Sequence, residues 1–447
     1  MRYNFELALR GLRRFPKSSV LVVLTVALGL AACMTTLTLL HVLSADPLPG
    51  RSQDLYLAWV NTLTSKPSTS HSLNGVHPVD YRTIKLPDAE AMLGAHKAVQ
   101  QTALADMTAV VSNEDGTRKQ ENQTLLATTS SFMPMFGVTL RHGRDWSAAE
   151  GKAREHVAVI DTHLARQLFG TTQAVGRSIR IRKTLFRVVG VSEAYSPQPH
   201  FYDLADWTFS TGPEFHESVF LPYTSALDAG LGPDYDQYCD DASHKQFMEG
   251  FEKFGERHCD WLSYWVRLDT PHQVAAFRAW LDDYAEQRQA LQGIHRAVHA
   301  RLFSIPQWLT VQRVVPDSVR LNAWMAASFL LLCMANVAGL LTARFLRRSG
   351  EIGIRRALGA PRRAIFVQHV AEAAAVCVLG GVLALPLTLL GLWILRLQQH
   401  GDSSLARLDP AMFGFLFALA LVVGILVGLV PAWRASRVEP GLQVKSA

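Results

Sequence analysis

Most residues of this chain that are able to bind a metal or react lie in one polar stretch. Thirteen of the 16 histidines fall between residues 46 and 317. They form no H-E-x-x-H or similarly tight metal motif, so we interpret them as scattered surface histidines. No G-x-S-x-G nucleophile motif is present. The sequence therefore predicts no metal site and no catalytic residue.

Two cysteines of this stretch, Cys239 and Cys259, lie close to His244 and His258. Such a set can form a disulfide, stay as free thiols or bind a metal as a Cys2His2 site. In an oxidising compartment a disulfide that closes this loop of about 20 residues is favoured. We predict that bridge and leave the alternatives open. The other three cysteines lie in apolar stretches and are interpreted as small apolar fillers: Cys33, Cys333 and Cys377.

Ionisable side chains near an apolar stretch are a second kind of candidate. Burying a charge at the centre of a membrane helix costs about 2.5 to 3.5 kcal/mol on insertion scales, so such residues are functional candidates. Glu372 and His369 lie one turn apart near the start of a long apolar run. We interpret their position as interfacial and not as part of a proton path.

The sequence contains four long apolar stretches. The chain has 447 residues, and its 49% hydrophobic and 18% charged content is apolar for a soluble protein. A helix needs about 20 apolar residues to cross a bilayer. We predict four transmembrane helices at residues 18–43, 320–345, 365–396 and 410–433. The first is too long for a signal-peptide h-region and is interpreted as retained.

The basic residues indicate the orientation of these helices. Near the ends of these stretches, lysine and arginine are concentrated in residues 1–17, at Arg344 and in residues 346–364, and in residues 434–447, whereas the loop between the third and fourth stretches has only Arg396 and Arg407. The positive-inside rule places these three segments in the cytoplasm and residues 46–317 outside it. The net charge of +6 is thus a topology signal and gives no support for nucleic acid binding. Residues 1–17 are also predicted to form an amphipathic helix at the membrane surface.

The large polar stretch has the pattern of an α+β domain. Predicted strands begin at Leu55, Leu104, Ser263 and Ala300, and predicted helices cover residues 80–99 and begin at Pro271. These two strand-helix-strand units, at residues 46–115 and 260–315, are expected to pair in one split layer. Residues 116–259 then form an inserted subdomain. It holds a strand leading into a helix (HVAVIDTHLARQLFG), a hairpin turning near Lys183, and long loops over residues 195–238.

The arginine-rich loop between the second and third helices contains EIGIRRALGAPRR. Its apolar and basic residues fall on different faces of a helix, and Gly359 with Pro361 is typical of a helix end. A stiff cytoplasmic helix with a defined face is suited to receive force from a partner. A basic loop that only fixes topology is the alternative interpretation.

Several motifs resemble one family of transporters. SGEIGIRRALGAPRRAIFVQHVAEAAAVCVLGG resembles the signature of the FtsX-like permease domain of MacB-type ABC transporters, and GLVPAWRASRVEPGLQV resembles its closing motif. FMPMFGVTLRHGRDWSAAE, VAVIDTHLARQLFG, VGRSIRI and FRVVGV resemble the MacB-type periplasmic core domain. The resemblance covers the whole chain in the family's order.

The resemblance implies an α-helical membrane protein with four transmembrane helices. A large α+β periplasmic domain, with porter-like (46–115, 260–315) and inserted (116–259) subdomains, would lie between helices 1 and 2. It implies a homodimer or related heterodimer that works with an ABC ATPase. No G-x-x-x-x-G-K-[ST] phosphate loop occurs here, so ATP and Mg²⁺ are expected on a separate ATPase chain. By resemblance the coupling element consists of Glu351, Ile352, Gly353, Ile354, Arg355, Arg356, Ala357, Leu358 and Gly359.

The function expected from these features is that of a non-catalytic permease subunit in a bacterial inner membrane. It would transmit ATPase motion to the periplasmic domain and drive efflux or export through a periplasmic adaptor and an outer-membrane duct. An FtsX-like regulator of cell-wall hydrolases, or a permease that extracts lipoproteins, is the alternative with the same architecture. A membrane-anchored sensor or enzyme would need no ATPase partner.

Overall fold

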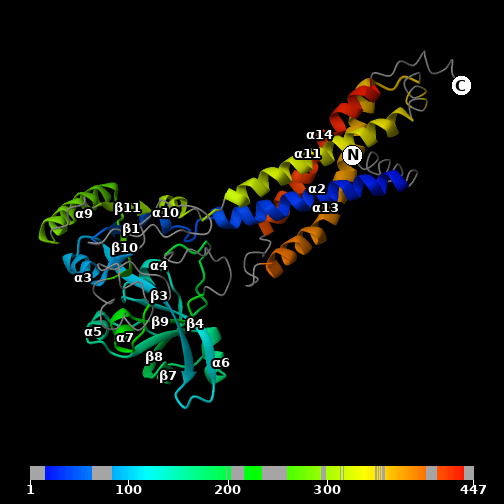
Figure 1. Cartoon of the computed structure of the whole chain (residues 1–447). Coiled ribbons are helices and arrows are strands. Elements are labelled where there is room, and N and C mark those ends of the chain that lie inside the picture. Colours follow the sequence, from blue (N-terminus) through cyan, green and yellow to red (C-terminus); the bar gives the residue numbers. More distant parts are fainter. Residues whose placement is uncertain are drawn as a thin grey trace. The chain divides into compact units, whose positions relative to one another are not determined.

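The computed structural model forms two compact units, which are described separately. It describes residues 16–62, 83–197, 199–202, 216–233, 259–292, 299–312, 314–315, 317–347, 358–398 and 410–436, together with 350, 352 and 354. A helical unit comprises Met1–Ser44 and Val315–Ala447, and an α/β unit comprises Ala45–Val314 (Figure 1). The predicted fold class, four membrane-type helices with a large α/β domain between the first and second, is confirmed.

The helical unit contains four long helices in its described residues. They are α2 (Pro16–Ser44), α11 (Asp317–Leu346), α13 (Arg362–Gln398) and α14 (Pro410–Ser436). Each is long and apolar enough to cross a membrane. The predicted amphipathic helix at residues 1–17 lies almost entirely outside the described residues, since the description begins at Pro16 within α2.

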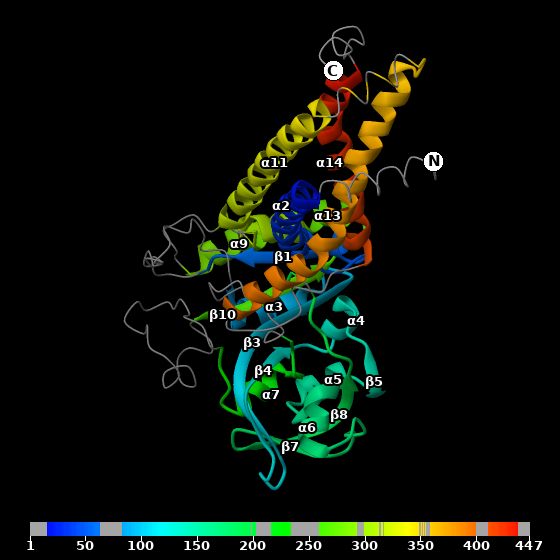
Figure 2. The same cartoon turned by 90° about the vertical axis from the view of Figure 1, so that its right-hand side faces the viewer.

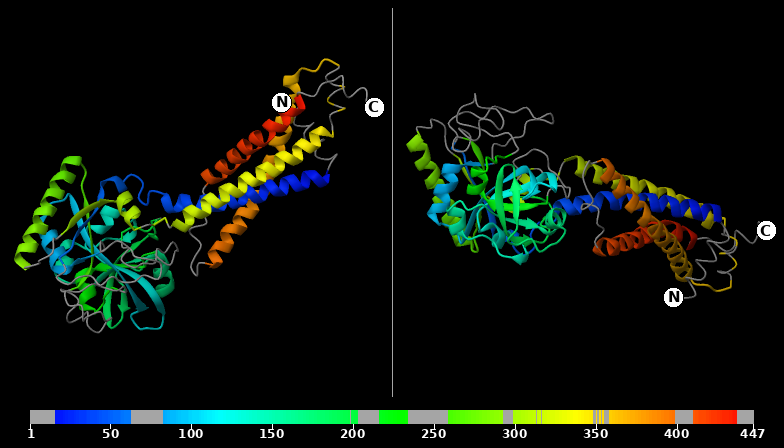
Figure 3. Two further views of the ribbon diagram at one scale, coloured as in Figure 1. Left: turned by 45° about the horizontal axis from the view of Figure 1, so that its top comes forward. Right: turned by 90° about the horizontal axis from the view of Figure 1, so that it is seen from below.

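The four long helices pack against one another (Figure 3), and small residues let them approach closely. A Cβ placed on Gly380 of α13 would lie 2.7 Å from Cγ1 of Val26 on α2. A Cβ on Gly424 of α14 would lie 2.8 Å from Cα of Ala374 on α13. Helices in lipid pack through such small residues, because hydrophobic burial gives them little drive to associate. The outer faces carry exposed apolar side chains suited to lipid, among them Leu331, Leu390, Val422 and Leu429.

In the residues that the structure describes, the α/β unit is organised around one mixed sheet of eleven strands. The strands are β1 (Leu55–Val60), β2 (Ile84–Lys85), β3 (Gln100–Asn113), β4 (Lys119–Thr128), β5 (Leu140–Gly143), β6 (Val157–Asp161), β7 (Ser178–Ile181), β8 (Thr184–Ser192), β9 (Val219–Pro222), β10 (Asp260–Arg267) and β11 (Ala300–Ser304). Their order is β11-β1-β10-β3-β4-β9-β6-β8-β5, with β2 on β10 and β7 on β3 and β8. The β4–β9 and β6–β8 pairs are parallel and the other pairs are antiparallel.

Strands from the two ends of the unit pair with one another in the sheet. β1 pairs with β10 at Leu57 and Trp265, and β10 pairs with β3 at Trp265 and Thr102. The sheet then continues past residue 116, because β3 and β4 form a long hairpin (Figure 2). The porter-like and inserted segments of the sequence are therefore parts of one continuous sheet.

Helices cover both faces of this sheet. They are η1 (Ser52–Asp54, a 3-10 turn), α3 (Leu86–Ala95), α4 (Phe132–Phe136), α5 (Ala148–Lys152), α6 (Thr162–Phe169), α7 (Tyr223–Asp228), α9 (Pro271–Gln292) and α10 (Ile305–Val311). Because successive side chains of a strand point to opposite faces, β3 contributes to two cores. Ala103, Ala105 and Met107 pack in the core that includes residues of α3, α6 and α9. Leu104 packs in an aromatic core with Phe132 and Trp265.

Three local expectations differ from the structure. The helix expected over residues 80–99 is shorter, because Pro87 fixes its first turn and His96 takes the left-handed conformation that ends it. Strand β4 was not expected, because KQENQT is too polar to be read as a strand until it is paired with β3. Strand β9 and α7 lie in the segment expected to be loops, where a four-residue strand gives too little alternation to be recognised.

Candidate functional site

A buried ionic cluster joins three of the four long helices. Arg344 of α11 and Glu372 of α13 form an ion pair, with Arg344 Nη2 3.2 Å from Glu372 Oε1. His369 Nδ1 lies 3.6 Å from Glu372 Oε2, and Arg344 Nη1 donates to Ser19 Oγ of α2 at 3.3 Å. The exposed fractions of Arg344, His369 and Glu372 are 7%, 4% and 3%. A buried charge is tolerated only when it is paired, so these helix ends are held in one arrangement.

The local sequence explains how the cluster forms. His369 and Glu372 are three residues apart on α13, so they share one face of the helix. Phe345, next to Arg344, stacks on the His369 ring with centroids 4.1 Å apart. The interfacial interpretation of Glu372 and His369 did not include their partner, because Arg344 was read as one of the arginines that fix topology. In a sequence, such a pair is indicated by a basic residue near the end of one membrane helix and an acidic residue near the start of the next.

The predicted coupling element is described only in part. Ile352, Ile354, Leu358 and Gly359 are described; the other members lie outside the described residues: Glu351, Gly353, Arg355, Arg356 and Ala357. Ile352 is 5% exposed and packs in the same core as Phe345 and Ile365.

The described residues of this element also carry two exposed apolar side chains. Leu358 N donates to Ile354 O at 3.0 Å, which is a helical turn. Ile354 is 61% exposed and Leu358 is 82% exposed. Gly359 follows with a φ of +95°, a conformation that suits glycine and ends the turn. Among its described residues, the segment thus has one side chain buried in the helical core and two exposed apolar side chains.

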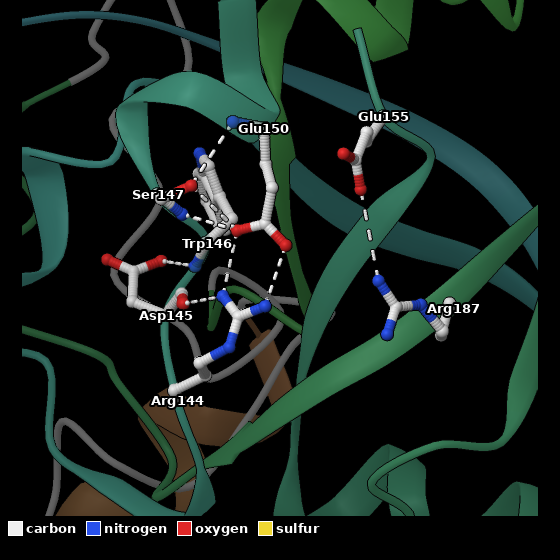
Figure 4. Close-up of polar contacts among 7 residues, drawn as sticks. All are labelled: Arg144, Asp145, Trp146, Ser147, Glu150, Glu155 and Arg187. Atoms are coloured by element: carbon white, nitrogen blue, oxygen red, sulfur yellow. Dashed lines mark hydrogen bonds and ion pairs between the residues drawn. The ribbon is translucent and has the colours of Figure 1, made fainter. Parts of the chain in front are cut away.

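The FMPMFGVTLRHGRDWSAAE motif of the α/β unit has a structural role (Figure 4). Arg144 donates to both carboxylate oxygens of Glu150 at 2.7 and 2.8 Å, and Ser147 and Glu150 form a capping box at the start of α5. Gly143 has a φ of +75°, and a Cβ there would lie 2.3 Å from Val189 O. Burial raises the pKa of Asp145 to about 7, and its carboxylate accepts a hydrogen bond from Trp146 N. These contacts fix the turn between β5 and α5.

The described cysteines agree with the predicted division into bridged cysteines and cysteines that fill apolar space. Cys259 is disulfide-bonded, whereas Cys33, Cys333 and Cys377 are free and buried. Cys239 lies outside the described residues. The pairing of Cys239 with Cys259 stays a prediction.

Family models match both units of the chain. The model of the MacB-like periplasmic core domain matches residues 19–284, more than half of the chain, and the model of the FtsX-like permease C-terminal domain matches residues 323–440. The chain belongs to the MacB/FtsX-like family of ABC transporter permeases. The predicted resemblance to this family is therefore confirmed.

Curated relatives of this permease carry the name macrolide export ATP-binding/permease protein MacB. The protein from Bdellovibrio bacteriovorus is 27% identical over 329 residues, which are 72% of this chain and 44% of the relative. The protein from Acinetobacter baylyi is 22% identical over 441 residues, which are 98% of this chain and 58% of the relative. The permease thus spans about half the length of the curated relatives it matches.

Solved structures of the same kind of domain are distantly similar. The periplasmic region of MacB from Actinobacillus actinomycetemcomitans is 13% identical, with a TM-score of 0.36, and the match covers 57% of this chain and 91% of that one. The extracellular domain of the noncanonic ABC-type transporter YknZ from Gram-positive bacteria is 13% identical, with a TM-score of 0.33, and the match covers 55% of this chain and 99% of that one.

Proposed function

We propose that this permease transmits the motion of an ABC ATPase across the bacterial inner membrane and so drives efflux or export. The ATPase, with its ATP and Mg²⁺, is a separate chain, and two permease copies act together. Residues 346–364 and both ends of the chain lie in the cytoplasm, and the α/β unit lies in the periplasm. There it works with an adaptor and an outer-membrane duct. The permease itself carries out no chemical step.

The observation that carries this proposal is the exposure of Ile354 and Leu358. Exposed apolar side chains in a basic segment are suited to fill a pocket of a partner protein. Ile352 anchors the same segment in the helical core, so a push on Leu358 is passed to the helices. The Arg344–Glu372 ion pair ties the helices on both sides of the segment.

The helices that receive this push are continuous in sequence with the α/β unit. α2 ends at Ser44 and α11 begins at Asp317, next to the limits of that unit at Ala45 and Val314. Displacement of α11 relative to α2 would therefore move the two ends of the α/β unit. This route needs no substrate channel through the spans.

The test is a charge placed on the proposed contact face. Leu358→Glu should remove the ABC ATPase that co-purifies with the permease in detergent, and with it the ATP hydrolysis of the complex. Leu291→Glu is the matched control, because Leu291 of α9 is 72% exposed in the α/β unit. Charge reversal of both Arg355 and Arg356 should uncouple ATPase stimulation without affecting membrane insertion. Undiminished ATP hydrolysis in the Leu358→Glu complex would remove the coupling assignment.

A further inference from the structure

Three side chains that can bind a metal meet at the junction of β6, α6 and the segment entering β9. They are Asp161, the last residue of β6, His163 in the first turn of α6, and His216. One ligand atom from each lies within 4.8 Å of the other two. The fold brings them together, because Asp161 N donates to Ser218 O at 2.9 Å where β6 and β9 pair.

The carboxylate of Asp161 has one oxygen that is placed to bind a cation. Its Oδ1 accepts a hydrogen bond from Leu164 N at 2.7 Å and caps α6. Its Oδ2 is buried, has no hydrogen-bond partner among the residues that the structure describes, and lies 3.6 Å from Nε2 of His216. The Asp161 side chain is 0% exposed. A buried carboxylate oxygen without a donor is costly, and a bound cation would offset that cost.

The two imidazoles supply the rest of a coordination set and a route to solvent. The rings of His163 and His216 are edge to face, with centroids 6.2 Å apart. The His216 side chain is 28% exposed and His163 is exposed, so an ion can enter from solvent. Ligand atoms around a tetrahedral Zn²⁺ lie about 3.3 Å apart, given bonds of about 2.0 to 2.2 Å. The Asp161–His216 distance nearly meets this value, and rotation of the exposed His163 can close the remaining gap.

We propose that Asp161, His163 and His216 form a binding site for one divalent transition-metal ion, with Zn²⁺ as the fitting occupant. Two imidazoles and one carboxylate suit zinc and leave a coordination position open to water or a further ligand. The positive end of the α6 dipole opposes a cation, and the Asp161 carboxylate between them offsets this effect. A bound ion would link the β6–α6 junction to the segment that enters β9. This site is independent of the coupling element and of the proposed function.

The test uses the full chain, purified in detergent without a histidine tag and stripped of metal by a chelator. Co²⁺ is titrated while its visible d–d absorption is recorded, and Zn²⁺ is then added to displace it. The wild-type protein should bind one equivalent at this site. His163→Ala and His216→Ala should each weaken binding about tenfold or more. Asp161→Asn should also weaken binding, while asparagine keeps the cap on α6.

Two control variants make the result specific. His272→Ala removes an exposed histidine of α9 outside the cluster and should bind Co²⁺ like the wild type. His200→Ala tests whether Co²⁺ binds instead at a second grouping of the α/β unit, which is formed by Asp106, His200 and Glu217. Because His163 is exposed, His163→Ala should keep the far-UV circular dichroism of the metal-free wild type. Weaker Co²⁺ binding by this variant would then not result from misfolding. The proposal is overturned if the wild type takes up no Co²⁺, or if His163→Ala and His216→Ala bind it equally well.

Discussion

At the scale of single residues, the Arg344–Glu372 pair is a buried ion pair between α11 and α13. Each side chain is almost fully buried, so removing one partner leaves the other charge in an apolar environment. We expect Arg344→Met or Glu372→Leu alone to lower the free energy of unfolding by about 3 to 5 kcal/mol. The Arg344→Met/Glu372→Leu double variant should lose less than the sum of the two, because it leaves no unpaired charge.

This prediction is checked by a double-mutant cycle on the full chain in detergent, with unfolding followed by circular dichroism. Arg347→Met is the matched control, since Arg347 is exposed just beyond the same end of α11 and its loss should change stability little. Additive losses in the double variant would mean that the two charges do not stabilise each other.

At the scale of the elements, the close approach of α14 to α13 is set by glycine. The absent Cβ of Gly424 leaves room for the backbone of Ala374, whereas Gly414 of the same helix has nothing within 4 Å. Gly424→Ala should therefore lower the melting temperature in detergent, because the two helices must move apart. Gly414→Ala should leave it unchanged or raise it, because alanine has the higher helix propensity. Equal melting temperatures for the two variants would show that the packing adjusts without cost.

The helices and strands also show which elements local sequence patterns can predict. The four long helices and the strands β1, β10 and β11 were predicted, because each has a strong local pattern of length or alternation. Strand β4 was missed, since its polar residues form a strand only through pairing with β3. The meeting of Asp161, His163 and His216 was not predicted, for a related reason. Asp161 and His163 are close in sequence, but His216 reaches them only through the pairing of β6 with β9.

At the scale of the whole molecule, the proposed mechanism needs residues 346–364 and the α/β unit on opposite sides of the membrane. We expect a cysteine introduced as Glu114→Cys, in an exposed turn of the α/β unit, to react with a membrane-impermeant maleimide applied to intact spheroplasts. Leu358→Cys should react only after the membrane is broken. The chain without an added cysteine gives the background of the native thiols. Labelling of Leu358→Cys in intact spheroplasts would reverse the topology and remove the proposed mechanism.

Local sequence patterns were sufficient to predict the four membrane-type helices, the α/β domain between the first two, and the family. These features rest on runs of about 20 apolar residues and on local motifs, which are properties of neighbouring residues. The contacts between side chains became known only from the tertiary structure. Arg344 reaches Ser19 across 325 residues of sequence, and Asp161 meets His216 through strand pairing. Such contacts depend on how distant segments pack, and no local pattern encodes that packing.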